Sequence, residues 1–81
     1  MADVRVTYDG TADAAYVYFT DPRTRARSAH MYACDPAGVD GMINLDFDAQ
    51  GRLIGVEVLG AASKLPGYLL ESAERLDAED A

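Results

Sequence analysis

The stretch Met42–Leu59, MINLDFDAQGRLIGVEVL, decides the fold of this chain. Apolar and polar residues alternate on both sides of Asp48–Gly51, which has the composition of a tight turn. We therefore expect a β-hairpin with strands at Ile43–Phe47 and Leu53–Leu59. Gly51 is expected in the left-handed region, because a hairpin loop of this length needs a residue with positive φ.

The register of this hairpin follows from its apolar residues. A four-residue turn pairs Leu45 with Ile54 and Ile43 with Val56, which places these side chains on one face. Three hydrogen-bonding side chains then lie on the opposite, polar face: Asn44, Asp46 and Glu57.

A second hairpin is expected near the N-terminus. Val4–Tyr8 and Ala14–Phe19 are rich in β-branched and aromatic residues, and Asp9–Asp13 between them is turn chemistry. A five-residue loop pairs Tyr8 with Ala14 and makes the second strand apolar on both faces. Such a strand needs cover on both sides, so a partner subunit is expected on the side that a helix leaves open.

The remaining segments complete an α+β fold. Arg27–Cys34 is a weaker strand, and Leu65–Leu76 predicts a helix that buries Leu69 and Leu76 on the sheet and exposes Glu71 and Glu74. We expect an antiparallel β-meander of about four or five strands with one C-terminal helix packed on one face. Residues 1–81 form a single domain, with a core at about 4–76 and an acidic tail at 77–81.

Composition limits the function classes. The 81 residues carry a formal net charge of −7 and a single cysteine, Cys34. A domain of this size buries only about 60–65% of its unfolded surface, which favours a homo-oligomer.

One cysteine allows no intrachain disulfide, and the sequence has no signal peptide or membrane-spanning run, so a cytoplasmic protein is expected. The negative charge argues against direct nucleic-acid contact and favours a basic protein partner.

Residues 46–57 also have the spacing of an EF-hand calcium loop. The candidate ligands are Asp46, Asp48 and Glu57, with Gly51 at the sixth position. The motif requires a helix on each side, whereas both flanks here favour strands. We therefore interpret the segment as a hairpin turn capped by Asp48, and we predict neither a metal nor a cofactor.

Other polar residues form weaker candidate sites. Asp9 and Asp13 could join Asp46 and Glu57 as an acid–base pair or a magnesium site, but turn capping is the favoured interpretation for the first two. Cys34 with His30 as its base would need help from another strand, because four strand residues span about 13 Å. A basic cluster precedes this strand and is expected to be a solvated loop or to pair with a partner's acidic residues: Arg23, Arg25 and Arg27.

Three segments together resemble a known family. They are Tyr8–Val17, Ile43–Leu59 and Ala62–Pro66. In this order they resemble the bacterial domain-of-unknown-function family 2283, over about residues 4–70 of this chain. The resemblance implies a small sheet with a C-terminal helix, and relatives that act beside a small toxin-like partner. It carries over no catalytic residues.

The sequence thus favours a non-catalytic, self-associating interaction module, antitoxin-like or accessory to a basic protein. The alternative is a small-ligand-binding or metal-dependent enzyme that uses the acidic residues of the polar sheet face. Convergence of the carboxylates in a concave site would favour the enzyme, and a flat polar face would favour the module.

Overall fold

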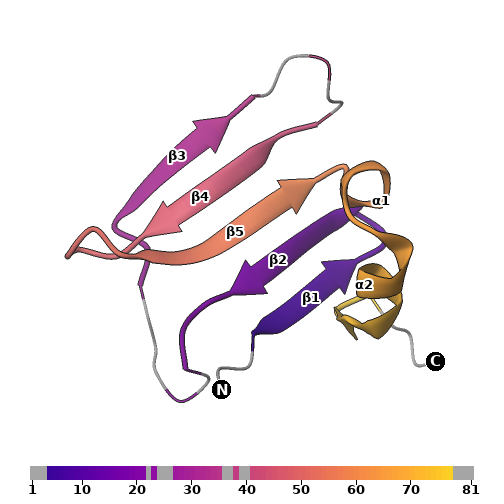
Figure 1. Ribbon diagram of the computed structural model, residues 1–81, viewed down its shortest axis with the longest axis horizontal. Coiled ribbons are helices and arrows are strands. Elements are labelled where there is room, and N and C mark those ends of the chain that lie inside the picture. Colours follow the sequence, from indigo (N-terminus) through magenta and orange to yellow (C-terminus); the bar gives the residue numbers. More distant parts are fainter. Residues whose placement is uncertain (1–3, 22, 24–26, 36–37, 39–40, 78–81) are drawn as a thin grey trace.

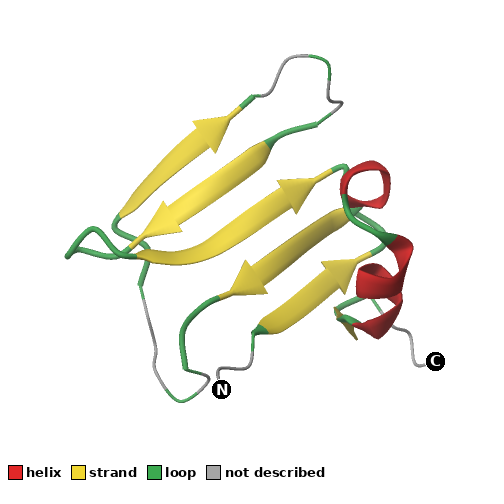
Figure 2. Ribbon diagram, in the orientation of Figure 1, coloured by secondary structure: helices red, strands yellow, loops and turns green. Residues whose placement is uncertain are grey.

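A single mixed β-sheet with two short helices makes up the fold (Figures 1 and 2). The computed structural model describes residues 4–21, 23, 27–35, 38 and 41–77. Within them the strands are β1 (Arg5–Asp9), β2 (Ala14–Tyr18), β3 (His30–Cys34), β4 (Ile43–Phe47), β5 (Leu53–Leu59) and β6 (Glu74–Arg75), and the helices are α1 (Ala61–Lys64) and α2 (Gly67–Ser72). None of the helices in these residues is long and apolar enough to cross a membrane.

The strand order corrects the predicted meander. The six strands lie in the order β3-β4-β5-β2-β1-β6, so β5 joins the two hairpin units by pairing with β2 at the centre of the sheet. β5 suits a central place because Ile54, Gly55 and Val58 along it are buried. β6 pairs with β1 in parallel, which makes the sheet mixed. The strands expected from the sequence are present, but the antiparallel meander of four or five strands is wrong.

The register of the β1–β2 hairpin differs from the prediction by one residue. Asp9 belongs to β1 and pairs with Ala14, so Tyr8 pairs with Ala15. The turn is four residues long and ends at Asp13, whose φ of 52° lies in the left-handed region. A one-residue slip exchanges the faces of a strand. β1 therefore places Thr7, rather than Val6 and Tyr8, on the face of Tyr16 and Tyr18, so this face of the hairpin is polar, whereas the prediction made it apolar.

In the β4–β5 hairpin the apolar and the polar side chains lie on opposite faces, as predicted. Ile43 pairs with Val58 and Leu45 with Val56, two residues further along β5 than predicted. An irregularity at Phe47 absorbs the difference. A shift of two residues returns every side chain to the same face, so the polar residues still lie together.

We name the two sides of the sheet by their residues. The apolar face carries Val6, Tyr8, Ala15, Val17, Ile43, Leu45, Val56 and Val58. The polar face carries Thr7, Tyr16, Tyr18, Asn44, Asp46 and Glu57.

The hydrophobic core lies at one end of the apolar face. Ala15 and Val58 are buried there against Ala61 of α1, which is 0% exposed, and Leu65 and Leu70 pack against them. Figure 1 shows α1 and α2 gathered at this end of the sheet. The helices therefore cover only part of the apolar face.

The predicted helix Leu65–Leu76 is wrong in its bounds. α1 ends before Leu65, which is extended, and Pro66 precedes the first residue of α2. Ala73 is extended in turn, and the chain then enters β6.

Tertiary contacts explain why the helix stops early. The Leu76 amide donates to the Tyr8 carbonyl at 2.9 Å, and Arg5 of β1 pairs with Glu74 at 3.0 Å. These bonds to β1 replace those of a further helical turn. Leu76 is consequently 57% exposed, which contradicts its predicted burial, and Leu69 is only half-buried. Glu71 and Glu74 are exposed, as predicted.

We expect Leu70→Ala to lower the free energy of unfolding by about 2 kcal/mol, the low end for a leucine truncation, because Leu70 is partly buried. Leu76→Ala is the control and should change it by less than about 0.5 kcal/mol, as for a surface substitution. Urea denaturation of both variants measures the difference. Equal losses would show that α2 does not pack through Leu70.

Candidate functional site

The polar face of the sheet gathers most of the chemically interesting side chains. Four neighbouring strands contribute to it, and the helices lie on the opposite face. Arg5 places its guanidinium 4.7 Å from the centre of the Tyr18 ring, and the Tyr16 and Tyr18 rings lie 4.5 Å apart at 48°. Thr7, between these groups, is only 1% exposed. The face is therefore a closely packed surface of polar and aromatic groups.

Tyr16 is the central member of the polar face. Its hydroxyl donates a hydrogen bond to Asp46 of β4, and its ring lies where a side chain at Gly55 would otherwise be. Burial, and secondarily the bond to Asp46, raises the pKa of Tyr16 above its usual value. The hydroxyl thus stays protonated at neutral pH and acts as a donor rather than a base.

Asp46 and Glu57 are held by separate partners. The second oxygen of Asp46 accepts a bond from the Ser28 hydroxyl at 3.2 Å. Glu57 accepts a bond from the Asn44 amide at 2.9 Å, and the Asn44 Oδ1 atom is buried without a hydrogen-bond partner. Each of the two carboxylates is therefore bonded by its own neutral donors.

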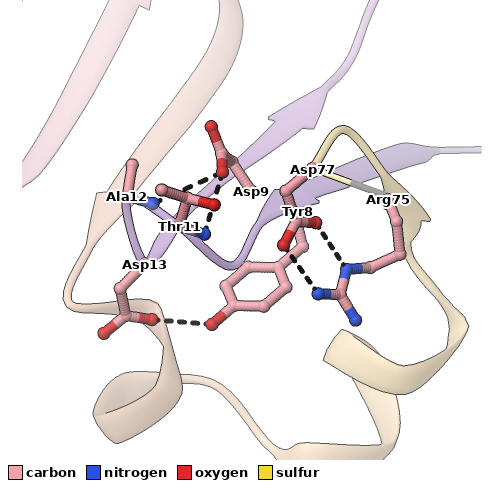
Figure 3. A network of polar contacts seen from close by, with 7 residues as sticks. All are labelled: Tyr8, Asp9, Thr11, Ala12, Asp13, Arg75 and Asp77. Carbon is pink, nitrogen blue, oxygen red and sulfur yellow. Dashed lines mark hydrogen bonds and ion pairs between the residues drawn. The ribbon is translucent and has the colours of Figure 1, made fainter. Parts of the chain in front are cut away.

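Asp9 caps the β1–β2 turn, as the turn chemistry predicts. One of its carboxylate oxygens accepts bonds from the Thr11 amide at 3.0 Å and the Ala12 amide at 3.3 Å (Figure 3). Both bonds stay within the turn, so this carboxylate stabilises local structure.

Asp13 reaches well beyond its own turn. Its carboxylate accepts bonds from the Tyr8 hydroxyl and from the Ala62 amide, both at 2.9 Å. Its carbonyl accepts bonds from the Gly60 amide at 2.9 Å and the Ala61 amide at 3.0 Å. Asp13 thereby satisfies the first amides of α1, and its bond raises the pKa of Tyr8. Sequence reasoning missed this role, because Ala62 lies 49 positions from Asp13.

The four carboxylates proposed as an enzyme site do not converge. Asp13 bonds Tyr8 of the apolar face and the start of α1, whereas Asp46 and Glu57 lie on the polar face. Asp9 is engaged in its own turn. The arrangement offers no pair of open carboxylates for acid–base chemistry among these four residues.

Arg75 and Asp77 hold the C-terminal segment against the β1–β2 hairpin (Figure 3). Two nitrogens of Arg75 bond the two oxygens of Asp77, each at 2.9 Å, and the Arg75 guanidinium lies 5.2 Å from the centre of the Tyr8 ring. A side chain at Gly10 would come within 2.6 Å of Asp77. Asp77 was expected to begin the acidic tail but is packed here, with its side chain 15% exposed. The rest of that tail, 78–81, lies outside the described residues.

The Arg75–Asp77 pair predicts a pH dependence. The bonds from Arg75 lower the pKa of Asp77 from 3.8 to about 2, so the folded protein holds this carboxylate ionised more strongly than the unfolded chain does. The stabilisation is present above pH 4 and is lost as the pH falls toward 2. Asp77→Asn should lower the melting temperature at pH 7, and its deficit should shrink between about pH 4 and pH 2.

A matched control is Asp21→Asn. Asp21 also pairs with its second neighbour, Arg23, but 45% of its side chain is exposed. The bonds from Arg23 also lower the pKa of Asp21, but the pair is more exposed, so this variant should show a smaller deficit than Asp77→Asn at pH 7. A deficit of Asp77→Asn that stays constant down to pH 2 would contradict the assignment.

The calcium-like loop has the geometry of a hairpin turn. Asp48 accepts bonds from the amides of Gln50 and Arg52, each at 2.9 Å, and Gly51 has a φ of 82°, as the turn chemistry predicted. The Arg52 amide is the largest cause of the lowered pKa of Asp48. β4 and β5 flank the loop where the calcium motif requires helices. Among the described residues, no group of three or more acidic, histidine or cysteine side chains could hold a metal ion.

We expect the chelator-stripped protein to show no saturable calcium binding tighter than about millimolar, the weak end for such loops. The reason is that Asp48 is already bonded to turn amides and to the Arg52 guanidinium. Calorimetric titration at low salt measures this. Saturable binding that Asp48→Asn abolishes would make the loop a metal site.

The other predicted candidates stay apart. His30 and Cys34 lie at opposite ends of β3, paired with Phe47 and Ile43. Arg23 pairs with Asp21 in its own loop at 3.0 Å. Arg25 lies outside the described residues. Arg27 lines an open cavity, so the two described arginines of the predicted cluster have different surroundings.

That cavity, of about 530 Å³, lies between Thr20–Asp21 and the β4–β5 turn. Its apolar lining comes from Phe19, Leu53 and Ile54. Asp48 at its rim is paired with Arg52 at 2.9 Å. The charges that line it are therefore partly neutralised by one another.

Comparison with known proteins gives a family. The model of the family described as Protein of unknown function (DUF2283) matches residues 5–61, so the chain belongs to this family. No curated protein and no solved structure matches the chain.

Proposed function

We propose that this member of the DUF2283 family is a non-catalytic interaction module that self-associates. The observation that supports the proposal is the incomplete cover of the sheet: α1 and α2 pack over one end of the apolar face only. Away from the helices, large apolar side chains remain exposed on the strands and just beyond them: Phe19, Met31, Tyr32 and Leu53.

Size supports the same proposal. An 81-residue chain buries a smaller fraction of its surface than a larger domain does, and the buried apolar residues in the described part of the chain are few and mostly small: Ala15, Ile54, Val58 and Ala61. A core of this kind gives limited stability, which association between copies can supplement. Large exposed apolar groups on a small domain commonly mark such contacts.

The negative charge of the chain supports a second kind of partner, a basic protein. The formal net charge of −7 attracts a positively charged protein and speeds its encounter with the module. An antitoxin-like or accessory role beside such a protein is consistent with this charge.

The alternative, a small-ligand-binding or metal-dependent enzyme, is supported less well. Its best support is the cavity beside Phe19 and Leu53. The acidic residues that it would use are engaged by other groups: Asp46 by Tyr16 and Ser28, and Glu57 by Asn44.

Light scattering at micromolar concentration tests the proposal. We expect particles that contain more than one chain of 8.7 kDa, because the uncovered apolar side chains gain by leaving water. Higher salt should not dissociate them, since screening reduces the repulsion between acidic copies. A particle of one chain at all accessible concentrations would contradict self-association.

A further inference from the structure

The two edges of the sheet differ in how they are protected. β6, at one edge, is two residues long and both are charged, Glu74 and Arg75. β3, at the other edge, has five residues, HMYAC, and carries no acidic residue, lysine or arginine. Short, charged edges are the usual protection against strand addition, and β3 lacks both features.

β3 is also uncovered on its faces. Four of its five residues are exposed, among them Met31 at 60% and Tyr32 at 63%. These two apolar side chains lie on opposite sides of the sheet, because Tyr32 pairs with Leu45 of the apolar face and Met31 with Asp46 of the polar face. An edge strand also presents a row of unpaired backbone amides and carbonyls. Backbone bonding and apolar contact thus favour the same addition.

We propose that β3 is where a second copy of this chain docks, with β3 of each copy antiparallel to the other about a two-fold axis at Tyr32. The proposal rests on the self-association proposed above and names its contact. The two sheets become one, and Tyr32 lies opposite Tyr32 of the second copy. An isologous contact of this kind closes at two copies, since each has one such edge.

This register uses the whole strand. Centring on Tyr32 places His30 opposite Cys34 of the second copy and Met31 opposite Ala33, so all five residues of β3 are paired. The two apolar faces come to lie on the same side, because directly opposite residues of an antiparallel pair share a face. The uncovered parts of both apolar faces then lie on one side of the joined sheet, and the contact itself covers exposed side chains of β3, among them Met31 and Tyr32, rather than Phe19 or Leu53.

Charge favours a second copy at this edge. The copies repel each other through their net charge of −7, and β3 is the edge free of acidic residues. β3 itself adds no like-charge repulsion to the contact, because none of its five residues is acidic, lysine or arginine.

Disulfide trapping tests the register. In a Cys34→Ala background, Tyr32→Cys should form a covalent dimer on mild oxidation, because opposite residues of an antiparallel pair have Cα atoms about 4.5–5.5 Å apart. His30→Cys in the same background is the matched control on the same side of the strand. Its two copies would lie about 13 Å apart along the strands and should not link.

A third variant, His30→Cys with the native Cys34 retained, should regain the covalent dimer, because these two positions face each other between copies. Within one chain they are too far apart to bridge. A covalent dimer from both His30→Cys variants alike would indicate random collision and would overturn the register.

A charge substitution tests the contact without oxidation. Tyr32→Lys would place two lysines directly opposite each other and should yield a single chain by light scattering. Tyr68→Lys, on α2 and 72% exposed, should leave the assembly unchanged. Circular dichroism of both variants confirms that they fold.

The outcomes separate this inference from the proposed function. An assembly that survives Tyr32→Lys and does not link through Tyr32→Cys would overturn docking at β3 while leaving self-association intact. A wild-type chain that is monomeric throughout would overturn both.

Discussion

The carboxylate and carbonyl of Asp13 form the junction on which the architecture depends. Four groups from separate parts of the chain donate to this one residue: the Tyr8 hydroxyl and the amides of Gly60, Ala61 and Ala62. α1 is too short to be stable alone, and its first amides would otherwise be left without acceptors. The junction holds Ala61 against Ala15 and Val58, and so positions the helices that close one end of the sheet. The left-handed backbone of Asp13, which aspartate tolerates better than most residues, is what turns its carbonyl toward α1.

The features that could be predicted from the sequence are those that depend on residues close together in the chain. The β4–β5 turn depends on Asp48 and Gly51, which lie three residues apart, and the Asp48 cap and the positive φ of Gly51 are as expected, although the strand pairing is shifted by two residues. The common face of Asn44, Asp46 and Glu57 also follows from the alternation of side chains along each strand alone. A register change of two residues leaves these side chains on the same face. The match of the family model to residues 5–61 confirms the resemblance carried by the same hairpin.

The errors arise where distant residues compete with local preference. The helical pattern of Leu65–Leu76 is real, but Glu74 gains an ion pair with Arg5, 69 residues away, and Leu76 gains a backbone bond to Tyr8. In the β1–β2 hairpin, Asp13 at the end of the turn bonds the start of α1, and no local signal carries that contact. The bonds of Tyr16 to Asp46 and of Asn44 to Glu57 likewise depend on which strands become neighbours. The enzyme hypothesis weakens for the same reason, since these contacts occupy the carboxylates that it would use.

The parallel pairing of β6 with β1 has a consequence for synthesis. β1 leaves the ribosome before β6 does, because it precedes β6 in the chain. Until β6 emerges, the outer edge of β1 has no partner strand, and the Tyr8 carbonyl lacks the amide of Leu76. The nascent sheet therefore has two open edges, and only one of them closes when the C-terminal segment folds back. A growing chain that stalls before Glu74 would expose both edges at once and could aggregate by strand addition at either, whereas completion of the fold closes the β1 edge.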